Sequence, residues 1–147
     1  MSSVRVSLKE TGQTDKLLSQ MPIELRTKHL KRAIGKAVRV MAKDARRRAP
    51  VDQGDDDGVK IKQSIRSRTF AEWDQPIVRG VVEVKGPAAV YSVPLEFGHK
   101  LVAWGNVTAG RVESRPFFRP AADTTENEQN RAVVTELRQS VEGFRRA

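Results

Sequence analysis

The chain has 147 residues, a length typical of a single domain that buries about two-thirds of its unfolded surface without metals or disulfides. It contains no cysteine, which excludes disulfides, and no apolar run approaches the roughly 20 residues of a membrane span. The first twenty residues carry several charges and do not resemble a signal peptide. These features predict a soluble intracellular protein with one domain over residues 1–147. The net charge of +9 favours an acidic partner, either nucleic acid or protein.

The first third of the chain predicts a strand and two helices. Residues 2–10 alternate between apolar and polar side chains, which is the pattern of a half-buried strand. A short helix is expected to follow and to reach Met21. The main helix is expected over 22–48, because its apolar side chains recur every three or four residues. Pro50 ends it, since the residue before a proline avoids helical geometry.

The middle of the chain predicts two strands. Residues 51–58 form a loop rich in glycine and aspartate, and the alternation over 59–66 predicts the first strand. A loop over 69–76 then holds Phe70 and Trp73. The second strand is expected over 78–84, where valines alternate with charged residues.

The last third predicts two helices around a long connection. Residues 88–97 predict a short helix interrupted near Pro94, and 98–115 a long polar connection, part of which could form a strand. A final helix follows Pro120. Because successive strands have no helical crossover between them, we predict an α+β fold. It would hold a small, mostly antiparallel sheet packed by the long helix of the N-terminal half, with a C-terminal helix.

Positive charge is concentrated in the predicted main helix, where Asp44 is the only acid between the first and last of ten cations. These cations are Arg26, Lys28, Lys31, Arg32, Lys36, Arg39, Lys43, Arg46, Arg47 and Arg48. Such a helix could follow a phosphate backbone, with binding that weakens steeply as salt increases. We interpret the charges as spread around the helix, and base-stacking aromatic residues are scarce. A solvated face or an acidic protein partner explains the helix equally well.

The acidic loop resembles a calcium-binding loop only in part. Asp55 and Asp57 occupy ligand positions when Gly58 is aligned with the glycine of the motif. The same alignment places Ser64 where the bidentate glutamate is required, so a solvated loop is favoured over a metal site.

Residue types typical of catalysis are sparse. Two isolated histidines, His29 and His99, cannot supply a zinc site without cysteine. Glu96 and His99 could form an acid–base pair, but no activated nucleophile stands near them in sequence. No glycine-rich phosphate-binding motif is present. The sequence therefore predicts a protein that is not an enzyme and has no metal or cofactor.

An aromatic pair lies between two prolines and two arginines in the segment 115–122. Pro120 suits the first turn of a helix, and Phe117 and Phe118 are expected on a stiff extended segment that leads into it. At least one ring is expected in the core, since aromatic side chains are usually buried. The other ring and the arginines fit a protein–protein interface, where aromatic and Arg residues are enriched.

Several short motifs, none of them specific alone, occur in an order that resembles a known family. They are Ala-Arg-Arg-Arg-Ala-Pro-Val-Asp-Gln-Gly at 45–54, Gly-Val-Lys-Ile-Lys-Gln-Ser-Ile at 58–65, Val-Glu-Val-Lys-Gly at 82–86, Tyr91, Glu-Phe-Gly at 96–98 and Arg-Pro-Phe-Phe-Arg-Pro-Ala at 115–121. This order resembles the tail-completion, or neck, proteins of long-tailed bacteriophages, a head–tail joining family also called a minor tail component. The resemblance covers about residues 24–125. The chain departs from it in a longer link between Gly54 and Ser64, and in His99, where a small polar residue is common.

The resemblance implies a structural virion protein without catalytic activity, made in the host cytoplasm and located at the head–tail junction. Such proteins form rings, often sixfold, through which the DNA passes. The implied partners are further copies of the chain (a hexamer), the connector or stopper, the tail terminator or tail tube, and phage DNA, but no membrane. The alternative is a basic DNA-binding module that acts without ring assembly.

Two candidate sites follow from this interpretation. In the first, the turn at 96–98 packs on the segment 115–120 and fixes how the long loops leave the sheet, at an interface between subunits or rings. Its candidate residues are Arg46, Arg47, Arg48, Glu96, Phe97, Arg115, Phe117, Phe118 and Arg119. In the second, three aspartates of the acidic loop line the channel, pair with a neighbour's arginines, or form only a solvated loop tip. They are Asp55, Asp56 and Asp57.

Overall fold

The central element of the fold is α2 (Ile23–Arg48), a helix of 26 residues. The computed structural model describes residues 2–3, 12–51, 60–72, 77–103 and 106–146. At 2–3, 12–15, 101–103 and 106–109 only the backbone is described. Pro22 precedes α2 and Ala49-Pro50 ends it, so the helix predicted over 22–48 is confirmed. The short helix predicted before Met21 is α1 (Gly12–Gln20).

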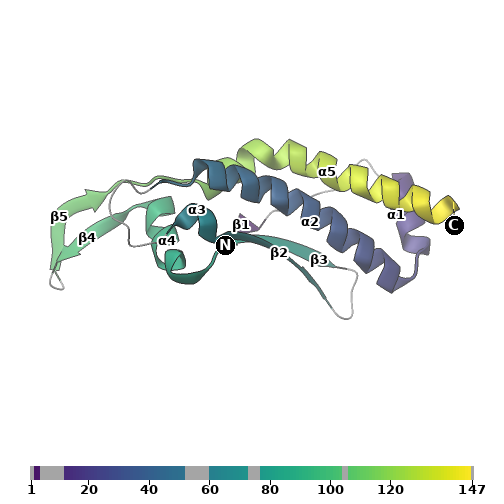
Figure 1. Cartoon of the computed structure of the whole chain (residues 1–147), viewed down its shortest axis with the longest axis horizontal. Coiled ribbons are helices and arrows are strands. Elements are labelled where there is room, and N and C mark those ends of the chain that lie inside the picture. The colour runs from purple at the N-terminus through teal and green to yellow at the C-terminus, as the bar shows by residue number, and fades with distance from the viewer. Residues whose placement is uncertain (1, 4–11, 52–59, 73–76, 104–105, 147) are drawn as a thin grey trace.

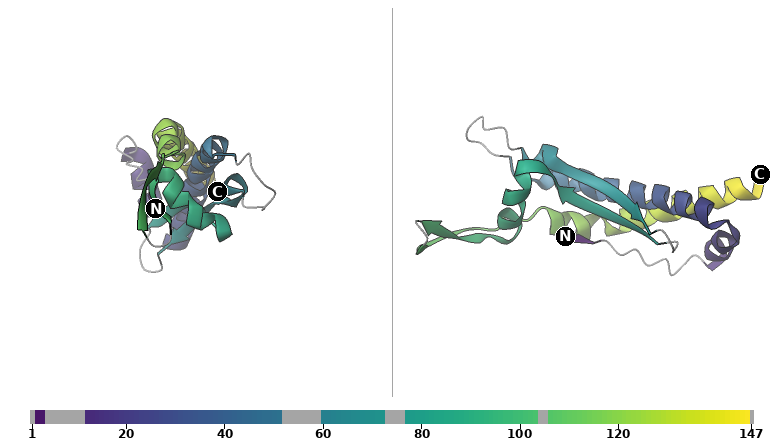
Figure 2. Two further views of the ribbon diagram at one scale, coloured as in Figure 1. Left: turned by 90° about the vertical axis from the view of Figure 1, so that its left-hand side faces the viewer. Right: turned by 90° about the horizontal axis from the view of Figure 1, so that it is seen from below.

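Two layers pack on α2. The first is α5 (Phe118–Arg146), which runs alongside α2 in the opposite direction (Figure 1). The second is a β-hairpin on another side of α2, which Figure 2 shows from below. The buried side chains of α2 are mostly small, so both layers can approach its backbone closely. They are Ala33, Ala37, Val38, Met41, Ala42 and Ala45, with Asp44 as the one buried acid of α2.

The hairpin consists of β2 (Ile65–Ala71) and β3 (Val78–Val84), paired antiparallel over their full length. The short strand β1 (Ser2–Ser3) pairs antiparallel with the other edge of β3, which gives the order β1-β3-β2. The predicted α+β class is therefore confirmed, with a small antiparallel sheet packed on the long helix. The remainder of the strand predicted over 2–10 lies outside the described residues.

Gly80 lets α2 and β3 approach each other closely. A Cβ atom built on Gly80 would lie 2.7 Å from Cγ2 of Ile34 and would also overlap the Val38 side chain. Both neighbours belong to α2, so any side chain at this position would push the helix away from the sheet.

The strand predicted over 59–66 is wrong in its boundaries. Residues 61–64 form the helical turn α3 (Ile61–Ser64), in which the Gln63 and Ser64 amides donate to the Lys60 carbonyl. The strand begins at Ile65 and continues through Phe70, which was expected in a loop. Ile61 and Ile65 are both buried and are four residues apart, a spacing that fits a helical turn as well as a strand.

The segment after β3 is more continuous than predicted. A 3₁₀ turn, η1 (Gly86–Ala88), leads directly into α4 (Ala89–Phe97), and α4 continues through Pro94 without interruption. Pro94 cannot donate an amide hydrogen bond, but the loss is confined to one position of a short helix. The next residue, Leu95, packs against the hydrophobic cluster between α2 and the sheet and helps to hold α4 in place.

The long connection predicted over 98–115 is mostly a second β-hairpin. Its strands are β4 (His99–Ala103) and β5 (Asn106–Val112), paired antiparallel with an irregularity between Lys100 and Val102. Figures 1 and 2 show this hairpin extending beyond α4 at one end of the elongated molecule. The sequence predicted that part of this connection could form a strand, and the structure has two strands here.

The core falls into two clusters along α2. One cluster joins the C-terminal half of α2 to the sheet and to Phe117, which is fully buried. The other joins the N-terminal half of α2 to α1 and α5 through Leu18, Met21 and Leu137. Both clusters run along one helix, so α2 links all the other layers.

The two long helices have the length of a membrane span, but neither is apolar enough, and no other helix of the described residues qualifies.

Candidate interaction surface

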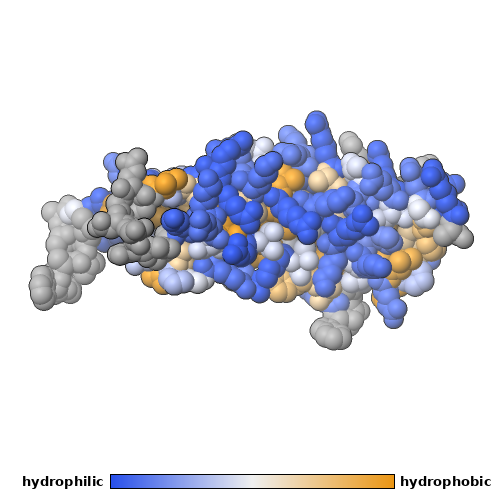
Figure 3. Space-filling view, viewed as in Figure 1, coloured by the Kyte–Doolittle hydropathy of each residue, from blue (hydrophilic) through white to orange (hydrophobic). Residues whose placement is uncertain are grey.

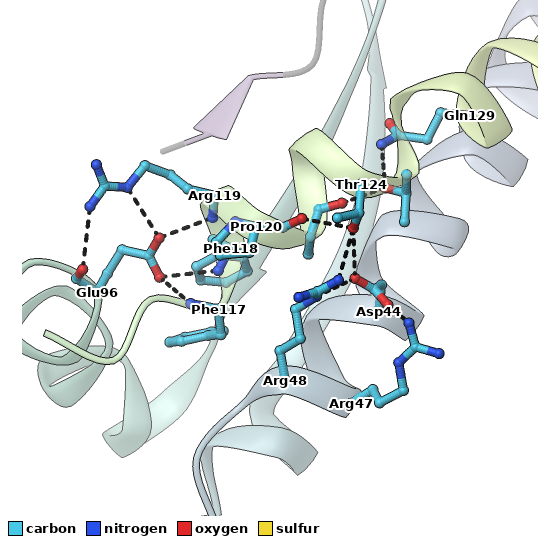
Figure 4. A network of polar contacts seen from close by, with 12 residues as sticks. Asp44, Arg47, Arg48, Glu96, Phe117, Phe118, Arg119, Pro120, Thr124 and Gln129 are labelled. Carbon is cyan, nitrogen blue, oxygen red and sulfur yellow. Dashed lines mark hydrogen bonds and ion pairs between the residues drawn. The ribbon is translucent and has the colours of Figure 1, made fainter.

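Glu96 joins α4 to the start of α5. Its Oε2 atom accepts hydrogen bonds from the backbone amides of Phe117 and Phe118, at 2.8 and 3.0 Å, and its Oε1 atom accepts one from the amide of Arg119 at 3.0 Å (Figure 4). These amides lie at the N-terminus of α5, where the first backbone N–H groups have no partner within the helix. The carboxylate therefore caps α5 from a residue more than twenty positions away, and its charge favours the positive end of the helix dipole.

The environment of Glu96 stabilises its ionised form. Burial alone would raise the pKa of this carboxyl group, which is 4% exposed. The hydrogen bonds from Phe117, Arg119 and Phe118 outweigh that effect, so the pKa of Glu96 lies below its ordinary value. A carboxylate held in this way serves as a structural anchor, and the acid–base pair considered for Glu96 and His99 gains no support from it.

Arg119 adds a second link between the two segments. Its Nε atom lies 3.5 Å from Oε1 of Glu96, and its guanidinium carbon lies 4.8 Å from the centre of the Phe97 ring. The amide of Arg115 also donates to the carbonyl of Leu95, at 2.7 Å. The packing predicted between the 96–98 turn and the 115–120 segment is therefore confirmed.

The same contacts assign Phe117 and Glu96 to the interior. Phe117 is 0% exposed, and its ring centre lies 4.4 Å from that of Phe118, which is half-buried. Both residues were predicted to contact another subunit. That prediction is wrong for them, because both side chains are buried within the chain. Phe97, Arg115 and Arg119 are exposed and remain candidates.

The C-terminal end of α2 holds a second polar network, also drawn in Figure 4. Asp44 is buried and pairs with Arg47 and with Nε of Arg48, the latter at 2.5 Å. Nη2 of Arg48 donates to Oγ1 of Thr124 in α5 at 3.0 Å. Burial tends to raise the pKa of Asp44, but the hydrogen bond from Arg48 and the charges of both arginines leave it lowered.

Arg46 is also engaged within the chain, since its Nη2 atom donates to the carbonyl of Ile65 at 2.8 Å. Of the three arginines predicted for an interface, Arg46 thus connects α2 to β2 and Arg48 connects α2 to α5, whereas Arg47 pairs with Asp44 of its own helix. Of the three, Arg47 keeps the most exposed side chain.

Glu136 of α5 forms a matching link near the middle of α2. Its carboxylate is buried, pairs with Lys36, and lies 2.6 Å from Nε of Arg32. The hydrogen bond from Lys36, aided by the charge of Arg32, lowers the pKa of Glu136 against the opposing effect of burial. The seam between α2 and α5 thus contains two buried carboxylates, Asp44 and Glu136, each neutralised by cations of α2.

Six of the ten cations of α2 share one face, whereas Lys31 and Arg48 are exposed outside it, so the charges are only partly spread around the helix. Six exposed cations follow one another at intervals of three or four residues, which places them in a single stripe. They are Lys28, Arg32, Lys36, Arg39, Lys43 and Arg47. Much of the rest of α2 packs on α5 and the sheet. Figure 3, which has the view of Figure 1, shows this side of the molecule dominated by hydrophilic side chains.

The exposed side of α4 is a feature that sequence reasoning missed. Val90, Val93 and Phe97 are 73%, 62% and 56% exposed, and their spacing places them on one side of the helix. Tyr91 beside them is also exposed. The apolar run at 88–97 was predicted only as a short helix, and the side of α4 that is buried carries Ser92 and Glu96. Nothing in the pattern distinguishes such a run from a core helix.

A groove of about 480 Å³ runs beside this exposed side of α4. Val82 and Val84 of β3 line one wall, and Val93 and Phe97 of α4 line the other. Polar side chains, among them Glu83 and Arg119, also line the groove. Together with the exposed apolar side of α4, the groove is called the α4 surface below. An exposed apolar patch of this kind typically marks an interaction site.

The candidate acidic site cannot be placed. Asp55, Asp56 and Asp57 lie outside the described residues, so their role in a channel or interface stays a prediction. Within the described ranges, no group of three His, Asp or Glu side chains is arranged to hold a metal ion.

Comparison with protein-family models, with curated proteins and with solved structures found no match to this chain.

Proposed function

We propose that the chain is a structural virion protein of a tailed bacteriophage that forms a ring at the head–tail junction, with DNA passing through it. The observation that carries the proposal is the Glu96 cap. It joins two motifs of the resemblance, Glu-Phe-Gly and Arg-Pro-Phe-Phe-Arg-Pro, by three hydrogen bonds at the root of the β4–β5 hairpin. The Glu96 cap therefore gives a physical reason for these two motifs to occur in the same chain.

A ring also requires two different complementary surfaces on each subunit. The α4 surface and the extended β4–β5 hairpin are two different surfaces on one chain. The buried carboxylates Asp44, Glu96 and Glu136 are all engaged in links between elements, which is the use expected in a protein that acts by shape.

The direct test removes the gene for this chain from the phage that encodes it and examines the particles by electron microscopy. Filled heads and separate tails that fail to join are expected, with infectivity restored when the protein is supplied. Normal, infectious particles without the protein would overturn the proposal. Purified protein mixed with isolated tails should add a ring of density at the tail end that meets the head.

A second candidate function, DNA binding without a ring, is favoured by the cationic stripe on α2. The stripe runs from Lys28 to Arg47, and the 19 steps between these residues give about 29 Å at 1.5 Å per residue. That length could follow a duplex backbone. Within the described part of the chain, Lys28, Arg39 and Lys43 have no ion-pair partner, so these three would be the first to meet phosphates.

A mobility-shift titration of the isolated chain at two salt concentrations separates the two functions. Tight binding whose salt dependence weakens by about 1 in slope for each stripe cation replaced would support DNA binding. The test variant is K28E/R39E/K43E, and the control K62E/K85E/K100E makes the same change in net charge outside the stripe. Equal effects of the two variants would assign the binding to net charge alone.

A further inference from the structure

The outer edge of β2 is open within the part of the chain that the structure describes. One edge of β2 pairs with β3 and one of its faces packs on α2, and no other described element has comparable contact with it. An open edge presents a row of backbone amides and carbonyls to another strand. An extended segment of another molecule can therefore add to this sheet.

The hydrogen bonds between β2 and β3 determine which backbone groups face the open edge. At the two ends of the hairpin, the Lys85 amide donates to the Ser64 carbonyl at 2.9 Å and the Glu72 amide to the Ile77 carbonyl at 3.0 Å. Bonded pairs recur at every second residue of an antiparallel ladder, so the even-numbered residues of β2 bond to β3. The odd-numbered residues direct their amides and carbonyls to the open edge. They are Ile65, Ser67, Thr69 and Ala71.

The side chains of the same residues face α2. Ile65 is buried and the other three are half-buried, whereas Arg66, Arg68 and Phe70 between them are exposed. In an antiparallel pair, two residues that bond to each other place their side chains on the same face of the sheet. The residues of an added strand that bond to β2 would therefore also direct their side chains to the α2 side.

Two contacts show which side of α2 runs along this edge. A Cβ atom built on Gly35 would lie 3.8 Å from Cγ2 of Thr69, and Nη2 of Arg46 donates to the Ile65 carbonyl at 2.8 Å. Arg39 lies one turn after Gly35 and two turns before Arg46, so it is on the same side of the helix. Arg39 is exposed, and the ion pairs of α2 within the described ranges involve other cations.

The open edge thus lies beside the cationic stripe of α2. Lys43, the next stripe residue after Arg39, is also exposed and outside those ion pairs. On the other face of β2, Arg66 and Arg68 share one acid, because Glu83 pairs with Arg68 at 2.6 Å and lies opposite Arg66 in the ladder. Positive charge therefore flanks the edge on both faces of the sheet. A strand with acidic side chains toward α2 would complement it.

We infer that β2 accepts an extended acidic segment of a partner protein as an added antiparallel strand, with Asp or Glu at every second position facing the stripe. The main chain of Ser67, Thr69 and Ala71 supplies the pairing, and the cations of α2 select the charge. This interaction does not depend on whether the chain forms a ring. Duplex DNA is the alternative ligand of the stripe, but it offers no strand to pair with the edge.

Fluorescence anisotropy of the full chain with a labelled peptide, Thr-Glu-Val-Glu-Val-Glu-Thr, tests the pairing. In the inferred complex the glutamates face α2 and their amides bond to β2, whereas the valine amides point away. N-methylation of the glutamates should weaken binding by about tenfold or more, because it removes main-chain hydrogen bonds at constant charge. N-methylation of the valines should leave binding as it is. Equal binding of the two methylated peptides, or no binding of the unmodified one, would overturn the inference.

Variants of the chain test the charge. R39E/K43E should abolish binding of the unmodified peptide. The control R131E/R138E, which makes the same change in net charge at exposed positions of α5, should bind as the wild type does. Equal effects of these two variants would assign the binding to net charge and contradict a site at the edge.

Ser67→Pro tests the edge from the other side. It removes one outward amide and leaves the ladder to β3 intact, a change that edge strands tolerate. Peptide binding should weaken by about tenfold, and any binding of duplex DNA should not change. Peptide binding that ignores S67P, or a chain that binds duplex DNA and no peptide, would overturn the inference. The methylated peptides act on the unmodified chain, so they decide the question even if S67P does not fold.

Discussion

Glu96 illustrates how one side chain can combine two segments that are separate in sequence. Sequence reasoning placed its turn next to the 115–120 segment, but it treated Glu96 as a surface contact. In the structure its carboxylate replaces the side-chain cap that the start of α5 would otherwise need. A pattern of residue types shows that a glutamate precedes a turn, but not which distant amides it meets.

Replacing Glu96 with Gln should reduce the free energy of unfolding by about 1 kcal/mol at neutral pH, because the capping charge is lost. The pKa of Glu96 is lower in the folded chain than in the unfolded one, where it is near 4.5. Its contribution is therefore complete above pH 4.5 and is lost as the pH falls through the lower folded value.

Urea unfolding of wild type and E96Q across this pH range provides the measurement. The difference between them should shrink in acid, and an unchanged difference would exclude the charged cap. E142Q, on the exposed side of α5, is the matched control and should behave as the wild type does.

Replacing either of two glycines with alanine should change the stability of the chain, in opposite directions. Gly80→Ala should cost about 1–3 kcal/mol, because the new methyl group overlaps Ile34 and Val38 of α2. Gly143→Ala should stabilise by up to about 1 kcal/mol, since it lies in α5 with no atom within 4 Å of the new methyl group. Thermal unfolding of both variants checks the pair, and a loss of stability in G143A would contradict it.

At the scale of elements, α2 and β3 could be predicted from the sequence, since each follows one clear hydrophobic period. The predictions failed where one pattern fits two structures. The spacing of Ile61 and Ile65 suits a helical turn or a strand, and the apolar residues of α4 suit a core or an interface. The stripe of six cations on α2 was also not singled out, because which side of the helix is exposed depends on how α5 and the sheet pack around it.

The seam between α2 and α5 leads to a prediction about Glu136. Its partners Arg32 and Lys36 are well exposed, so removal of the carboxylate leaves no buried cation. Breaking a buried ion pair strongly lowers the free energy of unfolding when it leaves a buried charge without a partner, and no such charge is left here. Glu136→Leu should therefore change the free energy of unfolding by less than about 1 kcal/mol, as the new side chain can pack beside Val133 and Leu137.

Glu136→Ala should be less stable than Glu136→Leu, because it leaves a void at the same position. Denaturant unfolding of the two variants at pH 7 gives the comparison. If E136L were as damaging as E136A, the ion pairs themselves would be essential to the seam.

At the scale of the whole molecule, the structure has a well-packed body and one poorly supported appendage. Amide hydrogen exchange of the free chain should be fast in β4 and β5 and slow in β2 and β3, which pack on α2. Strong protection of this hairpin in the free chain would contradict this division.

The position of β2 at the edge of its sheet has one more consequence. Within the described residues its outer edge pairs with no other strand, so another chain could pair with it beyond Ile65, whose carbonyl already accepts from Arg46. Two such edges meeting would bring Arg66 and Arg68 of both molecules close together. Mutual repulsion then discourages stacking into fibrils, a safeguard that matters for any protein gathered at high local density.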